Sequence, residues 1–204
     1  MNAEEQHRRD LKLIADLVTP GSRVLDIGCG NGELLEILGT ERDVDGRGLE
    51  LSQEGVNACV ARGLSVIQGD ADRDLADYPD NGFDYVILSQ TIQATRNPGG
   101  VMRDMRRIGK HLIVSFPNFG NWRIRLQLLL GGRMPVTRTL AHKWHDTPNI
   151  HLCTVSDFVS LCDELELVTV DALMLSGGNV RHASRPGWRD NLFAEESVFL
   201  LRRR

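Results

Sequence analysis

The chain has 204 residues, of which 41% are hydrophobic and 25% are charged, and its formal net charge is −4. This length suits one α/β domain, and we expect residues 1–204 to form a single domain with a sizeable core. The net charge gives no electrostatic case for nucleic acid as the main partner. No apolar run approaches the roughly 20 residues that span a bilayer, and the amino terminus lacks a signal-peptide apolar core. We therefore expect a cytoplasmic protein whose partners include neither a membrane nor nucleic acid.

The cysteines carry no metal or disulfide pattern. Cys29, Cys59, Cys153 and Cys162 are scattered along the chain without Cys-x-x-Cys spacing. This spacing argues against a zinc site and against a disulfide framework. We expect reduced thiols and no bound metal.

The first elements are a helix and a strand that ends in a glycine-rich loop. Apolar positions from Glu4 to Val18 fall near helical spacing, which predicts a helix ended by the turn at 19–21. The apolar run Val24–Ile27 then predicts a buried parallel strand. Glycines follow at alternate positions, and leucines at helical spacing come next: Gly28, Gly30, Gly32, Leu34, Leu35 and Leu38. Strand, glycine loop and helix together predict a nucleotide-type site at the carboxyl end of a parallel sheet.

The loop excludes the common phosphate-binding patterns. The dinucleotide fingerprint needs glycine or alanine at its sixth position, which here is Glu33, and no Gly-Lys-Ser/Thr follows for a phosphate loop. An NAD-dependent dehydrogenase is therefore disfavoured. Asp26 and Glu33 flank the loop and would repel a pyrophosphate. These carboxylates are compatible with a cationic ligand that has no phosphate, and S-adenosylmethionine, with its sulfonium and ammonium groups, fits that description.

The next two strands end in carboxylates. The run Val44–Leu51 predicts a second strand with Glu50 near its end, about 20 residues past the glycine loop, where an acid can accept from both ribose hydroxyls. A solvated surface glutamate is the alternative for Glu50. A third strand around 64–67 runs into Asp70 and Asp72. We expect one of these two carboxylates to accept from the adenine amine, and the sequence does not decide which one. Capping of a turn is the alternative for both.

Two further strand signals complete a doubly wound pattern. Phe83–Leu88 predicts the fourth strand, and the polar string Ser89–Gln93 after it is expected to face the reaction zone. A helix around 102–108 and a fifth strand at Leu112–Phe116 follow. Five strands alternating with helices indicate a parallel sheet with helices on both faces.

From Pro117 the pattern becomes irregular. Residues Trp122–Leu130 predict a helix stopped by two glycines, and the long stretch Met134–Ile150 lacks a periodic pattern. Loops of this length are often lids or binding segments, so we expect a lid-like insertion at about 117–150. His145, Asp146 and His151 suggest a catalytic set, but no nucleophile or metal spacing accompanies them, and structural or substrate-facing roles are equally open. The catalytic residues stay unassigned.

The last part of the chain predicts a helix from Thr154, a sixth strand at Leu167–Leu175 and a seventh at Ser197–Leu201. The seventh strand is most simply antiparallel. The polar segment Ser176–Glu196 between these strands has two interpretations, a solvated loop and a partner-binding surface.

This order of elements resembles a class I S-adenosylmethionine-dependent methyltransferase. The resemblance covers nearly the whole chain and implies an α/β, doubly wound, seven-stranded and mostly parallel sheet in the order 3-2-1-4-5-7-6. It also implies S-adenosylmethionine or S-adenosylhomocysteine as cofactor. The positions that match the superfamily's cofactor contacts are Asp26, Gly28, Cys29, Gly30, Gly32, Glu50, Leu51, Asp70, Ala71, Asp72, Ser89 and Gln90.

A narrower resemblance is to the MetW family of methionine biosynthesis. It is carried by five strings, Val66–Asp70, Leu88–Gln93, Ser115–Gly120, Gly132–Val136 and Asp146–Thr154. The resemblance implies a role with homoserine O-acyltransferase, which acylates homoserine on the route to methionine. It does not imply that the chain itself transfers a methyl group.

Two functions therefore stand side by side. In the first, the pocket senses S-adenosylmethionine and the protein is a partner or regulator of homoserine O-acyltransferase. In the second, the chain is an active methyltransferase on an unidentified small-molecule acceptor, working mainly through proximity and orientation. Ser89–Ile92 stands where amino-group methyltransferases often carry Asn-Pro-Pro-Tyr/Phe, which disfavours that subclass. We favour the first function because the cofactor loop is present without an evident base or acceptor motif.

Overall fold

The computed structural model describes residues 3–137 and 139–204, with side chains from Arg8 onward. Its strands form one eight-stranded sheet in the order β3-β2-β1-β4-β5-β8-β6-β7. The strands are β1 (Arg23–Ile27), β2 (Asp45–Glu50), β3 (Val66–Gln68), β4 (Phe83–Ser89), β5 (Gly109–Pro117), β6 (Leu167–Ser176), β7 (Asn179–His182) and β8 (Glu196–Arg203). The helices are α1 (Ala3–Asp16), α2 (Glu33–Arg42), α3 (Gln53–Ala61), α4 (Pro98–Ile108), α5 (Trp122–Gly131), α6 (Val155–Glu164) and α7 (Trp188–Phe193), with short 3₁₀ turns η1 (Asp74–Asp77) and η2 (Ile92–Ala94).

The pairing confirms the predicted doubly wound topology. β1 pairs in parallel with both β2 and β4, and β4 pairs in parallel with β5. β8 lies between β5 and β6 and runs antiparallel to both. The carboxyl ends of β1, β2, β3 and β4 therefore meet at one edge of the sheet, which is where such folds bind ligands.

The prediction of seven strands was wrong by one. Residues 176–196, expected to be a polar segment, contain the extra strand β7 and the short helix α7. β7 pairs antiparallel with β6 through a two-residue turn, with Ser176 opposite Asn179. Gly177 and Gly178 make that turn with φ angles of 56° and 82°. Positive φ at both central residues matches the twist of a hairpin, and glycine adopts it without a steric penalty.

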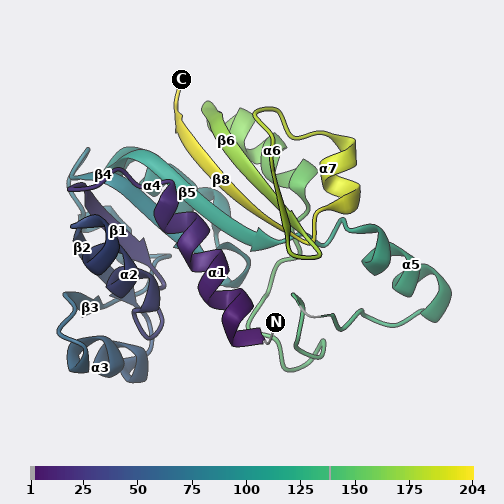
Figure 1. Ribbon diagram of the computed structural model, residues 1–204, viewed down its shortest axis with the longest axis horizontal. Helices are drawn as coiled ribbons and strands as arrows, with labels where there is room; N and C mark the ends of the chain where they lie inside the picture. The colour runs from purple at the N-terminus through teal and green to yellow at the C-terminus, as the bar shows by residue number, and fades with distance from the viewer. Residues whose placement is uncertain (1–2, 138) are drawn as a thin grey trace.

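Helices cover both faces of the sheet (Figure 1). α1 and α2 pack on one face around Ile14, Leu38 and Ile87, whereas α4 and α6 pack on the other around Met102 and Phe158. Neighbouring residues of the inner strands point to opposite faces, so the inner strands are buried on both sides. Within residues 3–137 and 139–204, no helix has the length and apolar character that crossing a membrane requires.

The region expected to be a lid-like insertion consists of α5 and an irregular return. α5 stands off one end of the molecule, apart from the sheet (Figure 1). The described residues between Gly132 and Thr154 form neither helix nor strand. The return rejoins the body where the backbone amides of Ile150 and His151 both donate to the carbonyl of Gln93, at 2.9 and 3.0 Å.

Candidate functional site

The glycine loop after β1 is built on left-handed backbone. Gly28, Gly30 and Gly32 have φ angles of 70°, 57° and 83°. A Cβ at Gly28 would lie 2.6 Å from the Thr91 Oγ1, whereas a Cβ at Gly30 would meet nothing within 4 Å. Glycine at position 28 is therefore required by a close approach, and position 30 faces open space next to the site.

Glu50 ties the end of β2 to this loop. Its Oε2 accepts from the Gly30 amide and its Oε1 from the Ser52 amide, both at 2.9 Å. These bonds fix the carboxylate in one orientation at the carboxyl end of the strand. Because each carboxylate oxygen has a second lone pair, both oxygens can still accept from a pair of ribose hydroxyls.

The two candidate adenine carboxylates have different surroundings. Asp72 accepts from the Arg96 and Asn97 amides with separate oxygens, each at 2.8 Å, and so anchors the approach to α4. Asp70 uses only Oδ1 to accept a backbone amide, that of Asp72, at 3.0 Å. Its Oδ2 lies 3.8 Å from the exposed Arg73 guanidinium. Asp70 therefore has the greater capacity to accept from a ligand.

A cavity of about 200 Å³ brings half of the sequence-predicted site residues together. The predicted residues that line it are Gly28, Glu50, Leu51, Asp70, Ala71 and Asp72. Sequence reasoning did not assign the other lining residues, which are Leu49, Gly69, Thr91, Ala94 and Thr95. The described lining has three carboxylates and no lysine, arginine or histidine. A phosphate would be repelled here, whereas a cationic or neutral nucleoside would not.

Asp26 is a buried carboxyl under the loop. Its side chain is 2% exposed, and its Oδ1 has no hydrogen-bond partner among the described residues. Burial, together with the negative charge of Glu50, raises the pKa of Asp26 to about 8. Burial also raises the pKa of the Cys29 thiol, which lies 4.0 Å from the Cys59 sulfur, and both cysteines are free. A cation bound beside Asp26 would favour its ionised form.

Ser89 and Gln90 do not line the nucleoside cavity. Ser89 Oγ lies 3.2 Å from Ser115 Oγ on the neighbouring strand. Gln90 adopts a φ of 55° and hydrogen-bonds through its side chain to Glu196. The left-handed backbone turns both side chains toward β5 and β8, so the polar residue that reaches the cavity is the next one, Thr91.

Gln93 connects the cavity to the irregular return of residues 132–154. It is 1% exposed and follows Thr91 within the β4–α4 connection. Its Nε2 donates to the Pro117 carbonyl at 3.1 Å, and its Oε1 accepts from Asn149 Nδ2 at 3.3 Å. Three strings that resemble the MetW family therefore meet at one buried amide. The same sequence string supplies Thr91 to the cavity and Gln93 to this junction.

The structure does not bring His145 and His151 together at one site. His145 is exposed and contacts Trp144 edge-on, with ring centroids 5.4 Å apart. His151 Nε2 lies 3.4 Å from the Arg96 carbonyl, beside the Asp72 anchor. The structure therefore places His151 beside Arg96, the residue that follows the cavity-lining Thr95, and neither histidine lines the cavity.

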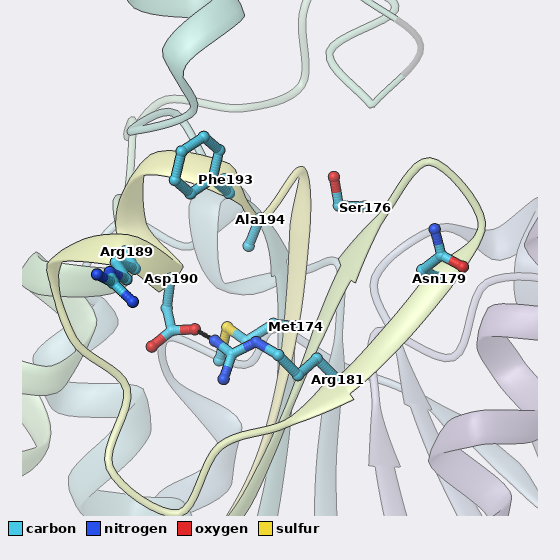
Figure 2. A pocket seen from close by; sticks show the side chains of 8 residues that line it. All are labelled: Met174, Ser176, Asn179, Arg181, Arg189, Asp190, Phe193 and Ala194. Carbon is cyan, nitrogen blue, oxygen red and sulfur yellow. Dashed lines mark ion pairs between the residues drawn. The ribbon is translucent and has the colours of Figure 1, made fainter.

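A larger cavity of about 530 Å³ lies between β6, β7 and α7 (Figure 2). Arg181 from β7 and Asp190 from α7 form an ion pair across it, and Asp190 also accepts from the Gly187 amide at 2.8 Å. The ion pair and the cap together fix α7 onto the hairpin. This cavity shares no lining residue with the nucleoside cavity.

Comparison with known proteins identifies both fold and family. The chain matches the family model "Methionine biosynthesis protein MetW" over residues 8–201. It is 34% identical over 203 residues to the bifunctional methionine biosynthesis protein MetXA/MetW of Rhodopirellula baltica, covering 95% of this chain and 32% of that protein. It is 32% identical over 126 residues to the demethylmenaquinone methyltransferase of Geobacillus kaustophilus, covering 54% of this chain and 52% of that protein. The chain thus matches about a third of the length of the first of these curated relatives and about half of the second.

Solved structures share the fold at low sequence identity. An S-adenosylmethionine-dependent methyltransferase from Thermotoga maritima, a possible histamine N-methyltransferase, matches with a TM-score of 0.70 and 14% identity, covering 99% of this chain and 91% of that one. Magnesium protoporphyrin IX methyltransferase from Synechocystis, solved with S-adenosylhomocysteine bound, matches with a TM-score of 0.63 and 16% identity over 97% and 84% of the two chains. These likenesses confirm the methyltransferase fold. Together with the family model, they show that the chain belongs to the methionine biosynthesis protein MetW family.

Proposed function

We propose that the protein binds S-adenosylmethionine or S-adenosylhomocysteine in the acidic cavity and acts as a partner or regulator of homoserine O-acyltransferase. The observation that carries the cofactor assignment is the lining of the cavity, which joins a glycine loop to three carboxylates without a basic residue. Membership of a methionine biosynthesis family sets the metabolic context. S-adenosylmethionine is made from methionine, so its binding here would report the end product of the route.

Each part of the cofactor has a complementary group. Glu50 accepts from the ribose hydroxyls with oxygens that the backbone already orients. Asp70 accepts from the adenine amine, because one backbone amide uses its carboxylate, whereas Asp72 accepts two amides that hold the start of α4. Asp26 lies under the loop, where the ammonium and sulfonium charges would favour its ionised form. The cofactor lies across Gly30, where an added Cβ would meet no atom within 4 Å.

The partner assignment rests on the family and on one relative. The protein from Rhodopirellula baltica carries MetXA and MetW in one polypeptide, and this chain aligns with 32% of it. Two activities joined in one chain work at high effective concentration, which is useful where they act on each other. Homoserine O-acyltransferase, the partner that the MetW resemblance implies, is accordingly the acyltransferase we assign.

The test combines binding with acyltransferase activity. Calorimetric titration of the purified chain with S-adenosylhomocysteine is expected to give one site per chain. Adding the chain to homoserine O-acyltransferase is expected to change its rate, and S-adenosylmethionine is expected to modulate that change. No binding of either cofactor would refute the cofactor assignment, and an unchanged acyltransferase rate would refute the partner.

Methyl transfer to a small acceptor is the second candidate. A cavity of about 300 Å³ lies at the base of α5, lined by Asn121, Arg123, Ile124, Thr137, Thr139, Gly177 and Glu195. It is large enough for a small polar molecule. Incubation with methyl-labelled S-adenosylmethionine and cell extract, with and without the acyltransferase, separates the candidates, because only a methyltransferase leaves label on an acceptor.

A further inference from the structure

α5 exposes apolar side chains that the fold does not use. Of its residues only Ile124 is buried. Leu129 and Leu130 are 79% and 77% exposed, and the apolar exposure continues past the helix at Met134 and Val136. A helix that exposes five large apolar side chains is normally covered by other parts of a protein, and such clustered apolar exposure marks an interaction site. We call Trp122, Leu126, Leu128, Leu129, Leu130, Met134 and Val136 the α5 patch.

The base of α5 is held firmly. Asn121 is 3% exposed and caps the helix by accepting from the Arg123 amide at 2.9 Å. Its Nδ2 donates to the carbonyls of Phe193 and Ala194 at 3.2 and 3.0 Å. Asn118, which is fully buried, donates to the Ala194 carbonyl at 2.8 Å as well. The patch is therefore presented on a fixed base, which reduces the ordering entropy that binding would cost.

The charge around the patch restricts what can cover it. Residues 122–136 contain three arginines and no aspartate or glutamate. The three are Arg123, Arg125 and Arg133. Arg123 lies 3.4 Å from Glu195, so a second copy of the chain packed α5 against α5 would bring chiefly Arg125 and Arg133 together across a two-fold axis, which is unfavourable. A partner with an apolar groove and an acidic rim would complement the patch.

We propose that the α5 patch is the surface on which homoserine O-acyltransferase docks. The inference rests on the proposed function, because it takes the partner from there. The MetXA/MetW protein of Rhodopirellula baltica joins the two parts in one polypeptide, which keeps them at high effective concentration. α5, which carries most of the patch, stands apart from the sheet (Figure 1), and no residue of the patch lines the nucleoside cavity.

The test is a double substitution on the full chain, Leu129→Gln with Leu130→Gln, which removes the two most exposed leucines and keeps residues that favour helix. The control is Val60→Gln on α3, which changes a residue that is 59% exposed away from α5. Affinity for the purified acyltransferase is measured by calorimetry. We expect at least a tenfold loss for the double variant and no change for the control, with S-adenosylhomocysteine binding retained by both.

Other outcomes separate the inference from the function on which it rests. Unchanged acyltransferase affinity in the double variant, while the wild type binds, overturns the α5 surface and leaves the partner assignment intact. Failure of the wild type to bind the acyltransferase removes the partner itself. Light scattering tests whether a second copy covers α5. A dimeric wild type and a monomeric double variant that still binds the acyltransferase would show that it does, and would overturn the inference.

Discussion

Glu50, Asp70 and Asp72 differ in how the backbone already uses their carboxylate oxygens. Glu50 and Asp72 each accept two backbone amides, and Asp70 accepts one. The amides at Glu50 belong to Gly30 of the glycine loop and to Ser52 at the start of α3, whereas those at Asp72 belong to Arg96 and Asn97 before α4. Under the proposed assignment, the carboxylates of Glu50 and Asp70 serve binding and that of Asp72 serves folding.

Glu50→Ala is expected to weaken S-adenosylhomocysteine binding by roughly 1.5–3 kcal/mol, because charge-assisted bonds to the ribose are lost. The measurement is calorimetric titration. Glu54→Ala is the matched control, since it removes the same charge from the exposed first turn of α3. Equal affinities in Glu50→Ala and the wild type would show that the ribose does not bind at Glu50.

Asp70→Ala is expected to affect ligand affinity, whereas Asp72→Ala is expected to affect stability. Asp70→Ala should reduce ligand affinity by at least tenfold and change the unfolding free energy little. Asp72→Ala should lower the unfolding free energy by about 1–3 kcal/mol, because the Arg96 and Asn97 amides lose their acceptors. Titration and urea unfolding of both variants check this. A larger loss of affinity in an Asp72→Ala protein that unfolds like the wild type would assign the adenine to Asp72 instead.

Asp26 makes the stability of the ligand-free protein depend on pH. Its folded pKa of about 8 lies above the ordinary 3.8, so between these values the folded state holds a proton that the unfolded state has released. The unfolding free energy contributed by this group therefore falls as pH rises from about 4 to about 8, by at most ~1.4 kcal/mol per unit. Urea unfolding at pH 5, 6 and 7 should show that Asp26→Asn lacks this slope. Parallel slopes in variant and wild type would contradict a raised pKa.

At the scale of elements, the connection between β4 and α4 joins the cavity to the region that carries α5. Thr91, Ala94 and Thr95 line the cavity. Gln93, which lies between them, hydrogen-bonds to Pro117 and to residues 149–151. If ligand binding moved this connection, the chain segments before and after α5 would move with it. The arrangement makes η2 the structural link between the nucleoside cavity and the segments on either side of α5.

Gln93→Leu is expected to lower the unfolding free energy by about 1–3 kcal/mol, because the buried Pro117 carbonyl and the Asn149 amide lose their partner. Hydrogen exchange of the Ile150 and His151 amides should quicken as the junction loosens. The control is Gln53→Leu on the exposed start of α3, expected within about 0.5 kcal/mol of the wild type. Unchanged exchange in a stable Gln93→Leu protein would mean that the backbone bonds alone hold the return.

The succession of β1 to β6 and β8 along the chain, and the helices between them, could be predicted from apolar periodicity and the glycine loop. The order of the strands in the sheet came from the resemblance to class I methyltransferases. β7 was missed although Gly177-Gly178 between β-prone runs is a hairpin signal. The polar composition of residues 176–196 outweighed it. α7 is six residues long, too short for a periodic pattern. It is held in place by the Arg181–Asp190 ion pair, a tertiary contact that no local pattern reveals.

For the cavity, sequence reasoning found the strand-end residues but not the direction of each side chain. The strand-end rule pointed to Ser89 and Gln90 equally with Thr91. Only the left-handed backbone of Gln90, with its φ of 55°, decides that Thr91 faces the cavity. Likewise the spacing of Asp70 and Asp72 could not show that α4 already uses Asp72. These details depend on contacts between segments distant in the sequence.

At the scale of the whole molecule, the nucleoside cavity and the α5 patch are separate surfaces on one body. They share no residue, and the described contacts between them run through Gln93, Pro117 and the buried Asn118 to Asn121 turn. A ligand in the cavity can alter partner affinity only if it binds the free and the partner-bound protein differently. Any such difference must act equally in both directions.

The last prediction is this reciprocity. If S-adenosylmethionine changes the affinity of the chain for homoserine O-acyltransferase by some factor, then the acyltransferase must change the affinity for S-adenosylmethionine by the same factor, expected at about 5- to 150-fold. Four titrations close the cycle: acyltransferase into chain with and without ligand, and ligand into chain with and without acyltransferase. Gln93→Leu should reduce the factor while both separate affinities survive, because it loosens the link and leaves both surfaces intact. A factor of one in the wild type would mean that cofactor and partner bind independently, and the chain would then be a docking subunit that does not sense its cofactor.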